Sequence, residues 1–241
     1  MKKIIKVKNR NHLDWLIKKE LKLQAIKCDL NHLDVSSVTD MSCLFHGSRF
    51  NVDISKWNTS NVQDMSWMFA NSQFNGDISE WNTSSVTDMS CIFYRSRFKG
   101  NISKWNTSNV IYMKGMFATS QFNGDISRWN TGQVQDMNGM FASSHFDGDI
   151  SGWNTSKVHN MGNMFESSMF NGDLTLWDIS KAESIESMFE DCSAPRPYWS
   201  QYENKKKRDS AIKEFKQIQR EKETLNQIVP TKDEIGTIHK I

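Results

Sequence analysis

The feature that most constrains this chain is a repeat of 24 residues that runs through most of its length. Tryptophan returns at every 24th position without an insertion or a deletion, at Trp57, Trp81, Trp105, Trp129, Trp153 and Trp177. Columns of Phe, Met and Val keep the same step. A coil of this size cannot bury its own apolar face, so each coil must stack on its neighbours. The sequence therefore predicts a core that continues from coil to coil, with the Trp column buried in it.

Each repeat reads F-N-G-D-I-S-x-W-N-T-S-x-V-x-D-M-S-x-M-F-x-x-S-x. The phrase D-I-S-x-W lies between turn residues, which is typical of a short strand. The phrase D-M-S-x-M-F has apolar residues one helical turn apart behind an Asp, which predicts a capped single turn of α- or 3₁₀-helix. We therefore expect an α/β repeat fold. It would be a solenoid with short helical turns and a parallel β ladder whose strands lie about 4.8 Å apart.

The phrase N-T-S-x-V-x-D-M-S-x-M-F followed by F-N-G-D-I-S-x-W resembles the repeat of the BspA-like bacterial leucine-rich-repeat family, a 24-residue bacterial surface protein repeat. The resemblance covers residues 27–192 and implies a leucine-rich-repeat-type solenoid. It also implies a surface protein or adhesin, although similar repeats occur in phage-encoded and intracellular proteins.

The start of the chain bears on its location. The segment M-K-K-I-I-K-V-K-N interrupts its apolar residues with lysines, and no apolar run approaches the roughly 18 residues that a membrane span needs. We therefore expect a form of the family without an export signal, cytoplasmic and not bound to a membrane. A secreted or surface adhesin is the alternative function that the resemblance implies.

The ends of the chain differ from the repeats and predict two further segments. Residues 1–26 predict a strand and then a helix begun by Asn11, as a small α/β cap on the solenoid of residues 27–192. One face of that helix would carry Leu13, Leu16, Ile17 and Leu21. Residues 193–241 predict a linker, a helix and a tail. The apolar residues of this second helix, interrupted by Lys222, are Ala211, Phe215, Ile218, Leu225 and Val229. It either caps the last coil or pairs with a partner, so a monomer and a homodimer through the C-terminal helix both remain open.

The net charge of +2 hides a segregation of charge along the chain. Residues 1–26 carry eight Lys and Arg against two Asp and Glu, and residues 192–241 carry eleven against seven. The region between them is acidic, with eleven against nineteen. The basic ends make a nucleic-acid-associated protein a second alternative function. The candidate contact with nucleic acid or another anion is the run Lys205, Lys206, Lys207 and Arg208, which can equally be the solvated start of a helix.

Nothing in the repeats indicates catalysis. The histidines fall in different columns, the four cysteines form no C-x-x-C pair, and no phosphate-binding loop occurs. Two columns of Asp, represented by Asp77 and Asp88, could be read as calcium ligands. Each Asp stands at a turn or a predicted helix start, however, where backbone amides can bind its carboxylate. We therefore expect no catalytic residue, no metal and no cofactor, in a protein that is not an enzyme.

The candidate functional residues lie where the repeat breaks at positions expected to face solvent. They are Trp67, Tyr94, Arg95, Arg97, Ile111, Tyr112 and Lys114. Tyr, Trp and Arg dominate the binding energy of protein interfaces. We expect Tyr94 and Tyr112, from successive repeats, to be neighbours in space; the alternative is drift of the repeat with local packing. The favoured function is a non-catalytic protein–protein interaction module that presents one face of the solenoid to a macromolecular partner.

Overall fold

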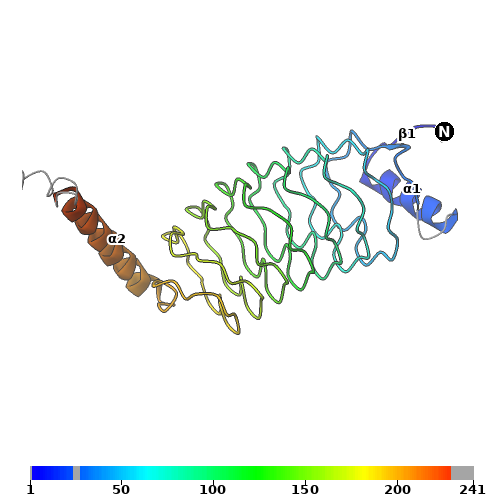
Figure 1. Cartoon of the computed structure of the whole chain (residues 1–241). Helices are drawn as coiled ribbons and strands as arrows, with labels where there is room; N and C mark the ends of the chain where they lie inside the picture. Colours follow the sequence, from blue (N-terminus) through cyan, green and yellow to red (C-terminus); the bar gives the residue numbers. More distant parts are fainter. Residues whose placement is uncertain (1, 24–27, 229–241) are drawn as a thin grey trace, which may run out of the picture. The chain divides into compact units, whose positions relative to one another are not determined.

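The computed structural model describes residues 2–23 and 28–228. Along these residues the elements are β1 (Ile5–Lys6), α1 (Arg10–Leu23), β2 (Leu33–Asp34) and α2 (Lys205–Ile228). The chain divides into two compact units, Met1–Pro197 and Tyr198–Ile241. The predicted boundary between residues 26 and 27 lies outside the described residues. In the first unit the repeats form a stack of coils, one coil for each repeat (Figure 1).

Successive coils are joined by backbone hydrogen bonds that recur with the period of the sequence. Parallel bridges link equivalent residues in adjacent coils, through Asp40, Asp64, Asp88, Tyr112, Asp136, Asn160 and Ser184. Beyond each bridge, alternate amides donate to the next coil. The Met89 amide donates to the Tyr112 carbonyl at 3.0 Å, and alternate amides as far as Arg95 bind the carbonyl 23 residues further on. Because every coil keeps this register, equivalent side chains form columns along the stack.

The predicted strand D-I-S-x-W is wrong in position. In the coil that contains Trp81, this phrase is a turn, because the Trp81 amide donates to the Ile78 carbonyl at 3.3 Å. The Ser79 amide donates to the carboxylate of Asp77 at 2.9 Å, so it too bonds within its own coil and not to a neighbouring coil. Apart from the bridge between Asp29 and Asp53, the bridges between coils lie around the Asp88 column instead.

The predicted helical turn D-M-S-x-M-F is also wrong. In the coil that contains Met89 it is a run of turns, in which only every second amide bonds three residues back within the coil. Cys91 has a φ of 54°, in the left-handed region, which a right-handed helix does not contain. The remaining amides face the next coil and bind it, so the segment joins coils instead of forming a helix.

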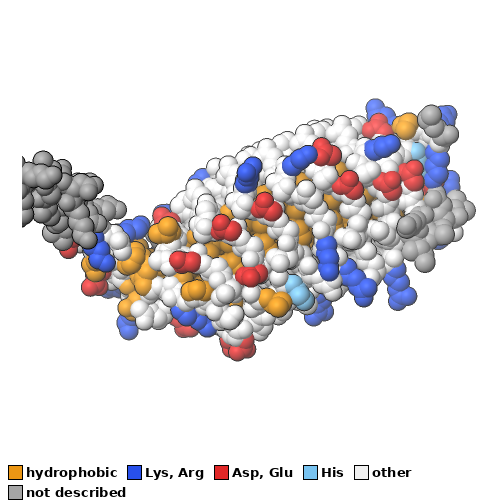
Figure 2. Space-filling model, viewed as in Figure 1, with side chains coloured by type: hydrophobic (Ala, Val, Ile, Leu, Met, Phe, Trp, Pro, Cys, Tyr) orange, Lys and Arg blue, Asp and Glu red, His pale blue; other side chains and the backbone are white. Residues whose placement is uncertain are grey.

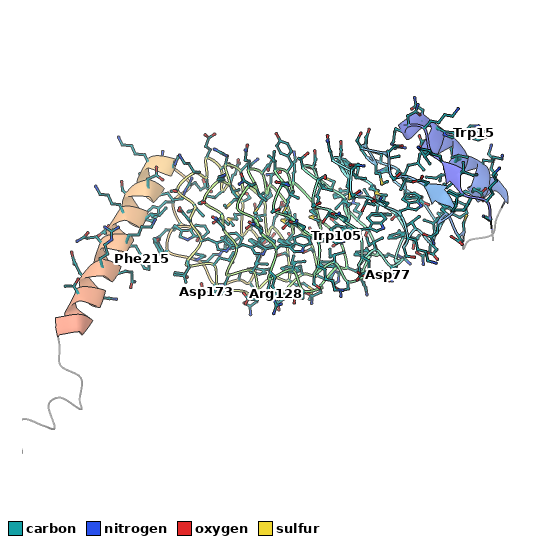
Figure 3. All side chains as sticks on the ribbon, turned by 90° about the horizontal axis from the view of Figure 1, so that it is seen from above. Trp15, Asp77, Trp105, Arg128, Asp173 and Phe215 are labelled. Carbon is teal, nitrogen blue, oxygen red and sulfur yellow. The ribbon has the colours of Figure 1, made fainter. Side chains whose placement is uncertain are left out.

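The core of the stack consists of the repeated aromatic, Met and Val columns. The Trp column is 3–4% exposed throughout, which confirms the prediction of a buried Trp ladder. Trp105 lies in the middle of the stack (Figure 3), and its ring stacks on that of Trp129 with centroids 6.5 Å apart. The two Phe columns pack against each other within each coil, as Phe93 does with Phe98 at 4.3 Å.

Short polar side chains close the turns of each coil. In the coil from Asp77 to Phe98, each acceptor binds the amide two residues further on; the acceptors are Asp77, Asn82, Asp88 and Ser96. Such bonds let Asp, Asn and Ser replace a backbone partner at a turn. The expectation that backbone amides satisfy the Asp columns is confirmed for both of them.

The N-terminal segment packs on the first coils through β1 and α1. β1 pairs in parallel with β2, with Ile5 opposite Leu33. The helix begins earlier than predicted, because the side chain of Asn9, and not of Asn11, accepts the His12 amide at 2.9 Å. Leu13, Leu16 and Ile17 are buried beneath the helix, and Leu21 is half-buried.

The second unit is built around α2. Its first turn is capped by Asn204, whose side chain accepts the Lys207 amide at 3.1 Å. Ile212 is buried, and the ring of Phe215 stacks on that of Tyr198 with centroids 4.0 Å apart. Ile218 is exposed. Val229 and the side chain of Leu225 lie outside the described residues, so the full apolar face predicted for this helix is not seen. Neither helix in the described part of the chain is both long and apolar enough to cross a bilayer.

Candidate partner-binding surface

A group of rings, two exposed and one half-buried, lies across three successive coils. We define the aromatic patch as His46, Trp67, Tyr94 and Arg95. The Trp67 and Tyr94 rings meet edge to face with centroids 5.5 Å apart, and the His46 ring lies 6.2 Å from Trp67. The guanidinium of Arg95 lies over the Tyr94 ring at 5.3 Å, within the range of a cation–π contact. The register of the coils therefore gathers residues from separate repeats into one surface cluster.

Two of the patch residues occupy strained backbone positions. Each coil has two left-handed positions, four residues apart. Trp67 (φ 58°) occupies the first of them in the second coil, and Arg95 (φ 51°) occupies the second of them in the third coil. The Trp67 column holds Gly115 and Gly139 in later coils. A left-handed conformation costs a residue with a Cβ about 1 to 2 kcal/mol, which glycine avoids. Trp67 is nevertheless 38% exposed. The position therefore holds a large ring where fold stability favours glycine.

The structure brings together some of the predicted residues and not others. Tyr94 contacts Trp67 and Arg95, whereas no ring contact joins it to Tyr112 among the described residues. The expected Tyr94–Tyr112 pair is therefore not formed. The reason is the register, because the bridges set Tyr112 opposite Asp88, while the amide of Arg95, beside Tyr94, binds the carbonyl of Ala118.

The other predicted residues differ in their exposure to solvent. Tyr112 is 46% exposed and replaces an Asp of its column. Arg97 and Lys114 are exposed, and Ile111 is half-buried. Sequence reasoning missed His46, although it stands in the same column as Tyr94, two repeats earlier. A ring at both positions, with Ala70 between them, was the signal that could have found it.

Acidic side chains recur along the stack beside a stripe of hydrophobic side chains (Figure 2). Asp77 and Asp173 lie along one edge of the stack (Figure 3). The pKa of Asp77 is lowered because its carboxylate accepts hydrogen bonds from the amide and then the hydroxyl of Ser79. The pKa of Asp53 is lowered chiefly by a hydrogen bond from the side chain of Asn31. These carboxylates are thus stabilised as anions by the coil itself.

A hollow of about 510 Å³ lies between Asp29, Asp53 and Asp77 at the first coils. Within the described residues, no three His, Cys, Asp or Glu side chains come close enough to hold a metal ion. The hydrogen bonds of Asp53 and Asp77 account for how the fold tolerates acidic side chains around this hollow.

The cysteines of the stack are free thiols. Burial raises the pKa of the Cys91 thiol to about 11, with the nearby charge of Lys114 opposing the shift. Burial also raises the pKa of Cys28. A thiol must ionise to act as a nucleophile, so these two environments work against covalent chemistry at neutral pH.

The four basic residues at the start of α2 differ in their exposure and in their partners. Lys206 and Lys207 are exposed, whereas the ammonium of Lys205 lies 3.2 Å from the carboxylate of Asp209. Arg208 is fully buried, and its guanidinium donates to the Tyr202 and Glu203 carbonyls at 3.1 and 3.0 Å. The prediction of Arg208 as a surface contact for nucleic acid is therefore wrong, because its side chain closes the start of the helix.

The comparisons with known proteins bear on the repeats. No curated protein and no solved structure matches the chain significantly. The sequence profile of one family matches twice, over residues 16–121 and 95–202, and so spans well over half of the 241 residues. The two matches agree with the resemblance of the repeats to the BspA-like family. The chain belongs to the family described as "Mycoplasma protein of unknown function, DUF285".

Proposed function

We propose that this protein is a non-catalytic protein–protein interaction module, a leucine-rich-repeat-type solenoid that presents the aromatic patch to a macromolecular partner. The parallel bridges at each 24-residue step and the buried columns support the solenoid. The observation that carries the function is the patch itself, in which Tyr94 contacts both Trp67 and Arg95 at the surface of an otherwise regular stack.

The composition of the columns supports a role in binding. Where the third coil has Tyr94, the neighbouring coils have Ala70 and Ala118, which shows that the stack does not need a ring there. Trp67 likewise stands in a column that accepts glycine. Aromatic residues and Arg are the types that carry most of the binding energy at protein interfaces. A Trp–Tyr–Arg cluster with Trp67 and Arg95 exposed and Tyr94 half-buried, at positions where small residues suffice, therefore fits an interface.

The hydrogen bonds of the recurring polar side chains support a non-catalytic role. The Asp, Asn and Ser side chains that recur in each coil accept backbone amides two residues further on. Catalysis needs a nucleophile or base aimed at a substrate. The recurring polar groups of the coil act as turn-closing acceptors instead.

The test is capture of a partner from an extract of the native host by the full-length chain. Trp67→Gly with Tyr94→Ala gives each position the residue found in its own column. We expect this variant to bind the partner at least about tenfold more weakly. Its melting temperature should stay the same or rise, because Trp67→Gly relieves a left-handed position.

The matched control is Leu176→Lys, at a side chain that is 87% exposed elsewhere on the stack. It should capture the partner as well as the wild type does. Equal capture by the patch variant and the wild type would contradict the assignment of the interface to the aromatic patch.

A further inference from the structure

We propose that the aromatic patch is half of a self-complementary surface, and that its partner is a second copy of this chain in antiparallel orientation. This inference rests on the proposed function and names the partner of the same surface. We define the ridge as residues 42–51 and the equivalent residues of each later coil, which are 66–75, 90–99, 114–123, 138–147, 162–171 and 186–195. The ridge includes the whole aromatic patch.

The ridge carries opposite charges at its two ends. Its first four coils carry five basic side chains and no acidic one: Arg49, Arg95, Arg97, Lys99 and Lys114. Its last three coils carry five acidic side chains and no basic one: Asp147, Glu166, Glu186, Glu190 and Asp191. All ten are exposed except Glu166, which is half-buried. The Asp88 column borders the ridge with half-buried carboxylates in the first, second, third and fifth coils, and these accept amides within their own coils.

An antiparallel second copy places opposite charges on facing coils, except for Lys114, which lies at the two-fold axis and faces its own equivalent. With a two-fold axis at the fourth coil, beside Lys114, the first coil of one copy faces the seventh coil of the other, and the third faces the fifth. Arg49 then lies toward the acidic seventh coil, and Arg97 toward Asp147. A parallel copy would instead set like charges opposite one another along the ridge. Complementary potentials of this kind orient association and exclude the wrong arrangement.

The apolar residues of the ridge follow the same pairing. Met169 is 61% exposed in the sixth coil, where the equivalent residue of the second coil is Gln73. The antiparallel arrangement sets the sixth coil against the second, which holds Trp67. A Met sulfur against an aromatic ring is a favourable contact. Two exposed apolar side chains, one from each copy, would thus lie on facing coils, twice per dimer.

The spacing of the coils favours a second copy over an unrelated protein. The ridge repeats once per coil, at about 4.8 Å where adjacent backbones bond. A second copy has the same spacing by construction, so charges that match at one coil stay matched along the ridge. Most homodimers have a two-fold axis and join the same patch on both subunits, which requires a surface that complements itself. The ridge meets that requirement in both charge and apolar residues.

The test is sedimentation equilibrium of the full-length chain and two charge-reversed variants. One variant carries Arg97→Glu, Lys99→Glu and Lys114→Glu, and the other carries Glu166→Lys, Glu186→Lys and Glu190→Lys. The wild type should dimerise more weakly as salt is raised. Each variant alone should self-associate at least about tenfold more weakly, because eight of the ten charges on its ridge then have the same sign. An equimolar mixture should regain a dimer, because the two ridges have opposite net charges.

Melting curves check that both variants fold. Ile218→Glu on α2 is the control for association through the C-terminal helix, and it should leave the dimer intact. Loss of the dimer in this variant, with no effect of the ridge variants, would place the dimer contact on α2 and overturn the ridge proposal. Failure of the mixture to regain a dimer, with both variants folded, would also overturn it.

The outcomes separate this inference from the proposed function. A wild-type chain that stays monomeric at about 100 µM, well above the micromolar affinities common for specific complexes, overturns the second copy. If that monomer still captures a different protein through Trp67 and Tyr94, the proposed function stands. If the chain dimerises but Trp67→Gly with Tyr94→Ala changes neither dimer nor capture, the aromatic patch fails as the interface and the proposed function fails with it.

Discussion

Trp105 serves the stack through its ring and through its indole nitrogen. The ring packs on Phe93 at 6.0 Å and on Trp129 at 6.5 Å, and Nε1 donates to the Ile78 carbonyl of the previous coil at 3.1 Å. The same bond recurs along the column from Trp57 to Trp177. The repeat predicts burial of this column, because a large apolar residue at each step must be covered by its neighbours. It does not predict the acceptor, which depends on the path of the preceding coil.

We expect Trp105→Ala to lower the free energy of unfolding by about 3 to 5 kcal/mol, because neighbouring coils cannot refill the cavity. Trp105→Phe keeps a ring but leaves the Ile78 carbonyl without its donor, so its effect should be smaller, about 1 to 3 kcal/mol. Urea denaturation measures both. Leu176→Ala, at an exposed site, should change the same quantity by less than about 0.5 kcal/mol. A loss below about 1 kcal/mol for Trp105→Ala would contradict a buried structural role.

The Asp column predicts how stability depends on pH. The pKa values of Asp77, Asp125 and Asp149 are lowered, chiefly because each carboxylate accepts the amide two residues further on. A carboxyl group whose pKa is lower in the folded chain stabilises the fold above its unfolded pKa, about pH 4, and loses that contribution as pH falls through the folded value. We therefore expect a constant melting temperature from about pH 7 to pH 5 and a fall below about pH 4.

Asp125→Asn is the specific check, because Asn101 already holds this position in another coil and accepts the Ser103 amide at 3.0 Å. The variant should melt less steeply with falling pH than the wild type does. Identical acid sensitivity of the two proteins would assign the acid dependence to other groups.

At the scale of the coil, sequence could predict the stacking but not the path of the backbone. The phrase D-I-S-x-W alternates like a strand, yet Asp77 and Ser79 close a turn there. The phrase around Met89 has helical spacing, yet the left-handed Cys91 turns its amides toward the next coil. Cys and Trp at a left-handed position give no sequence signal of positive φ, which is why the turns were predicted as a helix.

The glycine of the F-N-G phrase is required because a Cβ atom would not fit there, and this can be tested. At Gly124 a Cβ atom would lie 2.8 and 2.9 Å from ring atoms of Phe122, which is fully buried and cannot withdraw. We expect Gly124→Ala to lower the free energy of unfolding by about 1 to 3 kcal/mol through overpacking. Gly152→Ala is the matched control, because a Cβ there meets nothing within 4 Å. Denaturant unfolding of the two variants should differ; equal stability would show that the ring can shift.

At the scale of the whole molecule, the function depends on what differs between coils. The repeat breaks predicted Trp67, Tyr94 and Arg95 as candidates, and the structure joins these three in one cluster. The sequence predicts Tyr112 beside Tyr94 because their columns lie near one predicted helical turn in successive repeats, but that turn does not form and the register sets Tyr112 opposite Asp88. The opposite charges at the two ends of the ridge escape a count of net charge, since they cancel along its length.

The most direct test of the proposed function is hydroxyl-radical footprinting of the full-length chain, free and bound. The bound state is the complex with the captured protein, or the concentrated chain if that protein is a second copy. We predict that oxidation of Trp67 and Tyr94 slows severalfold on binding, while Trp15, an exposed ring on α1, oxidises at an unchanged rate. Equal oxidation of Trp67 and Tyr94 in the free and bound states would contradict the claim that the aromatic patch is the interface.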